Sequence, residues 1–135
     1  MAQERVLVID NSTETQLLLA EMVLAPNGYQ PIAARDGEEG LRLALEEHPD
    51  LIVLDMQLPK MNGLDATKEI RKTENHRKDN NRHSSRIPII AMTAQSMKGD
   101  REKCLQAGMD DYIAKPIKRE VVFAMVKKWC FERDK

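Results

Sequence analysis

The stretch that decides the fold runs from Asp50 to Asp55 and reads Asp-Leu-Ile-Val-Leu-Asp. Its four consecutive apolar residues are typical of a strand that is buried on both faces of a parallel sheet. Pro59 and the Asn62–Gly63 pair mark a loop, and a helical pattern starts after it. Asp55 therefore lies where a buried strand meets its loop. Taken alone, such an acid is better explained as one that simply ends a strand or caps a turn than as a functional residue, so the other strand ends must decide.

The same alternation of short apolar runs and helical patterns continues through the chain. Strands are predicted at residues 5–10, 29–34, 50–55, 87–92 and 111–114. A helical pattern follows each of these strands. Five strands that alternate with five helices predict an α/β fold with a doubly wound parallel sheet and helices on both faces.

Apolar residues at helical spacing indicate which face of each helix is buried. Pro26–Gly28 ends the first helix, the second starts at Asp36–Gly37, the third ends near Lys72, and the fourth covers residues 97–106. The buried stripes are expected to consist of Leu17, Leu18, Met22 and Val23 in the first helix, Leu41, Ala44 and Leu45 in the second, and Val121, Val122, Met125, Val126 and Trp129 in the last.

Residues 73–86 contain no apolar side chain. Because nothing here can be buried cheaply, we expect a solvated, extended loop, with a frayed helical start as an alternative for its first residues. His76 and His83 lie in this segment, but their separation and polar setting favour a solvated pair over a metal site.

Length and composition predict one domain spanning residues 1–135. The chain has 21 basic and 22 acidic residues, so no overall field points to nucleic acid or to a membrane surface. It has neither a long apolar run nor the apolar stretch of a signal peptide, and we therefore expect a cytoplasmic domain. Cys104 and Cys130 show no metal-ligand spacing and are interpreted as reduced packing residues.

The carboxyl ends of the predicted strands carry a distinctive set of polar residues: Asp10 and Asn11, Asp55, Thr93, and Lys115. In a doubly wound sheet these ends can converge on one crevice. Clustered carboxylates repel each other, and a magnesium ion with few protein ligands relieves that repulsion. With a lysine and a hydroxyl beside them, these residues describe phosphoryl transfer to a carboxylate.

The residues at these strand ends resemble those of a two-component receiver domain, and the resemblance covers essentially the whole length of the chain. It implies the flavodoxin-like receiver fold. The resemblance rests on four motifs that occur in order: Ile9–Asp10, Asp55 followed by Leu58–Gly63, Met92–Ala94, and Tyr112–Pro116. Each motif is weak alone, whereas all four together at strand ends are highly specific.

The resemblance implies a role for each residue of the site. Asp55 would be the phosphoacceptor and a magnesium ligand. Asp10 would hold magnesium through water, and the backbone carbonyl of Gln57 would complete the protein's contribution. Thr93 and Lys115 would contact the phosphoryl group.

Tyr112 matches the family's aromatic switch position, three residues before Lys115. A switch residue changes rotamer when Thr93 is drawn towards the phosphoryl group. The simpler alternative is an aromatic side chain at the edge of the sheet that only packs.

Asn11 departs from the family pattern, which usually has two adjacent acids at the end of the first strand. An amide oxygen can still bind magnesium, but one negative charge is gone, so we expect weak binding with a loss of about 10- to 100-fold. Asn11 also keeps open an alternative function, a pseudo-receiver that binds partners without phosphorylation.

The resemblance further implies a histidine kinase or a histidine-phosphotransfer domain as the partner. Residues 97–104 and 107–112 are similar to receivers of hybrid histidine kinases. The chain is expected to be either a stand-alone regulator or a domain of a larger protein. We expect it to be a monomer or a weak dimer. A flavodoxin-like cofactor binder or a small phosphatase would share the fold. Neither is supported, because no glycine-rich loop follows the first strand and no second acid lies two residues after Asp55.

Overall fold

The computed structural model describes residues 4–76, 86–93 and 98–133. Its strands form one parallel sheet in the order β2-β1-β3-β4-β5. The strands are β1 (Arg5–Ile9), β2 (Gln30–Ala34), β3 (Leu51–Asp55), β4 (Ile89–Thr93) and β5 (Asp111–Ala114). The predicted doubly wound, flavodoxin-like fold is therefore confirmed.

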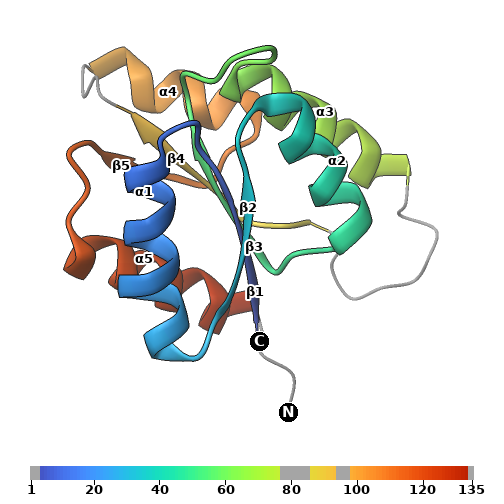
Figure 1. Ribbon diagram of the computed structural model, residues 1–135. Helices are drawn as coiled ribbons and strands as arrows, with labels where there is room; N and C mark the ends of the chain where they lie inside the picture. The colour runs from blue at the N-terminus through green and yellow to red at the C-terminus, as the bar shows by residue number, and fades with distance from the viewer. Residues whose placement is uncertain (1–3, 77–85, 94–97, 134–135) are drawn as a thin grey trace.

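The helices cover both faces of this sheet, with α1 and α5 on one side and α2 and α3 on the other (Figure 1). Their bounds are α1 (Thr13–Leu17), which continues as the π-helical segment η1 (Leu18–Leu24) and the 3-10 turn η2 (Ala25–Asn27), then α2 (Gly37–Glu47), α3 (Gly63–His76), α4 (Lys98–Ala107) and α5 (Arg119–Arg133). Within the described ranges, no helix is both long and apolar enough to cross a membrane.

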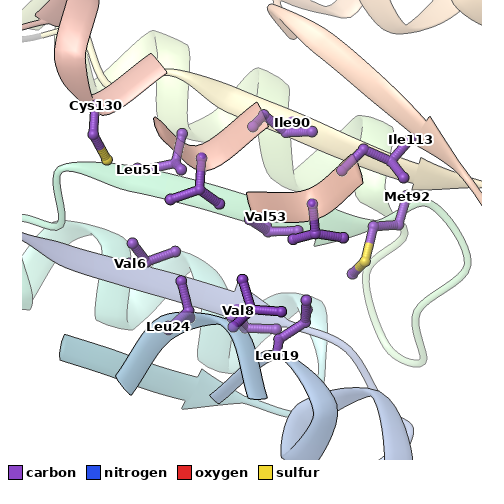
Figure 2. Packing of buried hydrophobic residues seen from close by; sticks show 13 residues of the cluster. Val6, Val8, Leu19, Leu24, Leu51, Val53, Ile90, Met92, Ile113 and Cys130 are labelled. Carbon is purple, nitrogen blue, oxygen red and sulfur yellow. The ribbon is translucent and has the colours of Figure 1, made fainter. Parts of the chain in front are cut away.

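The central strand β3 is buried along its whole length and divides the core in two. Leu51 and Val53 belong to the cluster under η1 and α5 (Figure 2), whereas Ile52 and Leu54 belong to the cluster under α2, α3 and α4. This two-sided burial follows from the unbroken apolar run, since successive side chains of a strand point to opposite faces.

The first helix buries a different stripe from the predicted one. Leu17 and Met22 are about half exposed, and the buried residues are Gln16, Leu19, Val23 and Leu24. These four positions have the regular spacing i, i+3, i+7 and i+8. The prediction is confirmed at Val23 and wrong at Leu17 and Met22, because the buried stripe begins with a polar residue. The predicted stop is confirmed, because Gly28 has the left-handed φ of 87° that ends the helix.

The third helix extends one turn beyond the predicted end and reaches His76. Glu74 lies in this extra turn and is only 8% exposed, so the prediction of a wholly solvated segment is wrong at its start. Its carboxylate is buried because it has partners, including Arg71 at 2.8 Å. Residues 77–85, and therefore the rest of the predicted loop with His83, lie outside the described part of the chain.

The buried stripe of α5 agrees with the prediction except at its ends. Val122 and Val126 are fully buried, and Met125 and Trp129 pack against the same cluster. Val121 is 44% exposed instead, and Cys130 completes the stripe at i+8 from Val122. Cys104 and Cys130 are both buried and unbridged, as expected for reduced packing residues.

Candidate functional site

The parallel sheet brings the predicted polar residues to one edge. Asp10 directly follows β1, Asp55 ends the neighbouring β3, Thr93 ends β4, and Lys115 directly follows β5. Asp10, Asp55 and Thr93 are each at most 8% exposed. Buried polar groups at the carboxyl ends of adjacent parallel strands are typical of a functional crevice.

Lys115 connects the two acids of this crevice. Its Nζ lies 3.3 Å from Asp10 Oδ2 and 3.2 Å from Asp55 Oδ2. The lysine side chain is 26% exposed, so its ammonium group is partly open to solvent. Two carboxylates that share one ammonium leave a net charge of about −1 in a largely buried place, which favours the approach of a further cation.

The carboxylate of Asp10 is held by its own loop. Its Oδ1 accepts a hydrogen bond from the backbone N–H of Ser12 at 2.7 Å, and its Oδ2 faces Lys115. Burial raises the pKa of Asp10 above its ordinary value of 3.8, and the nearby Asp55 acts in the same direction. The hydrogen bond from Ser12 and the charge of Lys115 oppose that rise. Asp10 is thus an acid whose charged form is costly until more positive charge arrives.

Asp55 has one oxygen directed to its loop and one to the crevice. Its Oδ1 accepts a hydrogen bond from the backbone N–H of Gln57 at 3.1 Å, whereas Oδ2 faces Lys115. Gln57 itself is exposed on the loop between β3 and α3. The local turn therefore orients the Asp55 carboxylate.

Asn11 is exposed, unlike Asp10 beside it. Its backbone carbonyl accepts a hydrogen bond from Arg35 Nη2 at 3.1 Å, which joins the loop after β1 to the end of β2. Arg35 was not predicted as a neighbour of the site, because no sequence signal links residues 24 positions apart.

Thr93 and Lys115 are neighbours through the backbone. The backbone N–H of Lys115 donates to the carbonyl oxygen of Thr93 at 2.7 Å, and the Lys115–Pro116 peptide bond is cis. Tyr112 is half-buried on β5 and packs against the cluster of α2, α3 and α4. This packing is compatible with either interpretation of Tyr112, as a switch or as an edge aromatic.

The donor set suits one hard divalent cation. Over the described residues, no three histidine, cysteine or acidic side chains gather into a metal-binding group, because the acids of this crevice number two, Asp10 and Asp55. Magnesium commonly uses one or two protein carboxylates and keeps several waters. The uncompensated charge beside Lys115 and the oxygen-only chemistry of Asp10 and Asp55 therefore fit magnesium.

Comparison with known families decides the family of this chain. A model of the response regulator receiver domain family matches residues 6–127. The chain belongs to this family. It is therefore a receiver domain of two-component signalling, which is a signalling domain.

The similarity to known relatives covers most of the chain. The polar-differentiation response regulator DivK of Brucella ovis is 42% identical over 117 residues, which cover 87% of each chain. The receiver domain of the sensor histidine kinase PA1611 from Pseudomonas aeruginosa PAO1 has a TM-score of 0.79 and 36% identity, over 96% of this chain and 99% of that one. That structure holds a magnesium ion in its active site cleft.

A second solved structure comes from a complex. The receiver domain of the response regulator Ssk1 from Saccharomyces cerevisiae, crystallised with the histidine phosphotransfer protein Ypd1, has a TM-score of 0.90 and 27% identity. The similarity covers 97% of this receiver and 91% of that chain.

Proposed function

We propose that this receiver takes a phosphoryl group from a phosphohistidine onto Asp55. A carboxylate oxygen of Asp55 forms the new bond to phosphorus, the phosphorus–nitrogen bond of the phosphohistidine breaks, and its electron pair remains on the imidazole. The donor is a histidine kinase or a histidine-phosphotransfer domain. The Ssk1–Ypd1 complex supports this class of partner.

The position of Lys115 is the observation that carries this proposal. Its ammonium group lies 3.2 Å from Asp55 Oδ2, close enough to stabilise negative charge that develops on an adjacent phosphoryl oxygen. Thr93, at the end of the next strand, supplies a hydroxyl for a second phosphoryl oxygen. Both groups are set by strand ends, so they need little reorganisation when the phosphoryl group arrives.

Magnesium is the proposed cofactor, held by Asp10, Asn11, Asp55 and the backbone carbonyl of Gln57. When bound, it supplies positive charge for the phosphoryl oxygens. The magnesium in the PA1611 receiver supports this cofactor. Weak binding is expected here, because the amide of Asn11 carries no charge.

Tyr112 is the proposed switch residue, which passes the change at Thr93 to the surface of β5. The receiver is proposed to act in the cytoplasm as a monomer or weak dimer, without binding nucleic acid or a membrane by itself. Its likeness to the PA1611 receiver supports a place in a hybrid histidine kinase or in a relay that serves one.

Labelling with acetyl phosphate and magnesium tests the proposal. We expect the intact mass to rise by one phosphoryl group, and Asp55→Asn to abolish this rise without loss of fold. Asp65→Asn, at an exposed acid in the first turn of α3, is the matched control and should be labelled normally. Label that survives in Asp55→Asn would show that another residue is the acceptor. An unlabelled wild-type protein that still binds its partner would favour the pseudo-receiver.

A further inference from the structure

Gln16 is a buried polar side chain that takes no direct part in the proposed phosphoryl transfer. It lies in α1, is 8% exposed, and points its amide at three backbone carbonyls. Nε2 lies 3.0 Å from the oxygen of Val8, 3.1 Å from that of Asp10 and 2.8 Å from that of Ala34. One side chain therefore joins the end of β1 to the end of β2.

The orientation of this amide follows from its neighbours. An amide nitrogen carries two donors, whereas the amide oxygen can only accept. Three carbonyl oxygens at hydrogen-bond distance can be satisfied only by the nitrogen, whose two hydrogens they share. Reversing the amide would place four acceptors together in a buried place, which is costly.

Gln16 also closes a ring of hydrogen bonds around Asp10. The backbone N–H of Asp10 donates to Ala34 at 3.0 Å, the same carbonyl that accepts from Gln16. The backbone N–H of Gln16 donates to the Ser12 carbonyl at 3.0 Å, and the N–H of Ser12 donates to Asp10 Oδ1 at 2.7 Å. The backbone and carboxylate of Asp10 are thus both fixed from the first turn of α1.

We propose that Gln16 is a positioning residue for the phosphoryl-transfer site. It holds the Asp10–Asn11 peptide so that the Asp10 carboxylate faces Lys115 and the cation, before either magnesium or phosphoryl donor binds. This inference rests on the proposed function. Its physical basis is preorganisation, because a metal-binding carboxylate gains affinity when surrounding hydrogen bonds fix its orientation.

The test compares Gln16→Met, which keeps the length of the side chain but loses both donors, with Gln16→His, which keeps one donor. Magnesium alone is the probe, titrated by calorimetry. We expect Gln16→Met to weaken magnesium affinity by about 10-fold, the lower end of the range for such supporting partners, with Gln16→His in between. Saturating magnesium should restore most of the labelling of Asp55 by acetyl phosphate.

Val126→Ala is the control for a simple loss of stability, since Val126 is fully buried in α5 within the cluster that also contains Leu19. It should lower the melting temperature and leave magnesium affinity unchanged. Gln16→Met with wild-type affinity would overturn the positioning role, and so would an equal loss of affinity in Val126→Ala.

A measurement on the wild-type protein covers the case in which the Gln16 variants do not fold. The side-chain amide signals of Gln16 in a nitrogen–proton spectrum should shift on adding magnesium, whereas those of Asn27 at η2 should not. Unmoved Gln16 signals would contradict the inference. If the wild-type protein bound magnesium but Asp55 took no label, the proposed function would fail. Gln16 would then still be a positioning residue, but only for the magnesium site.

Discussion

Glu74 Oε2 accepts a hydrogen bond from the backbone N–H of Ile87 at 2.7 Å, which joins the last turn of α3 to the entry of β4. The other oxygen of Glu74 accepts a hydrogen bond from Arg71 Nη1 at 2.8 Å. Arg71 Nη2 donates a hydrogen bond to Asp110 at 2.8 Å. Arg86 forms a further pair with Asp110 at 2.6 Å. This network lies at the amino ends of β4 and β5, whereas Asp55 lies at the carboxyl end of β3.

Glu74→Ala should lower the free energy of unfolding by about 2–4 kcal/mol, because it leaves the Ile87 N–H unsatisfied and removes one partner of the largely buried Arg71. Denaturant unfolding measures this change. Glu69→Ala, at an exposed position of the same helix, should alter stability by at most about 0.5 kcal/mol. Equal effects of the two variants would show that the network contributes little to stability.

Asn11→Asp should tighten magnesium binding by about 10-fold or more, because a carboxylate stabilises the cation better than an amide does. The same change should speed phosphorylation at limiting magnesium. It should slightly lower the stability of the metal-free protein, since a third acid is added near Asp10 and Asp55. Magnesium titrations followed by amide shifts compare the two proteins.

Asn27→Asp adds the same charge at η2, which precedes the amino end of β2, whereas the site lies at the carboxyl ends of the strands. It should leave magnesium affinity within about twofold of wild type, because salt screens the interaction of distant exposed charges. If Asn11→Asp bound magnesium no better than wild type, Asn11 would not contact the cation.

Asp10→Asn tests the cost of burying that acid. Because the folded-state pKa of Asp10 is raised above 3.8, the folded protein binds more protons than the unfolded chain between pH 3.8 and the raised value. This carboxyl therefore makes the metal-free protein less stable as pH rises through that window. The variant lacks this loss, so its stability relative to wild type should increase across the window and then level off.

Unfolding in urea at a series of pH values, with a chelator present, measures that difference. Asp36→Asn is a useful comparison, because hydrogen bonding to the backbone of Glu39 holds the pKa of Asp36 below its ordinary value. Its variant should show the opposite pH trend. A stability difference for Asp10→Asn that does not change with pH would contradict the raised pKa.

The order of strands and helices could be predicted from local patterns alone. An unbroken apolar run such as Leu51–Leu54 can be buried only between two layers of helices, and this requirement led directly to the parallel sheet. The convergence of Asp10, Asp55 and Lys115 followed too, because parallel strands end at one edge.

The burial of two polar side chains could be learned only from the tertiary structure. Gln16 and Glu74 are polar, and composition assigns such residues to the surface. Each is buried because partners distant in sequence satisfy it: Ala34 for the amide of Gln16, and Ile87 for the carboxylate of Glu74. A sequence pattern records the polarity of a side chain, whereas only the folded chain supplies the hydrogen bonds that offset the cost of burying it.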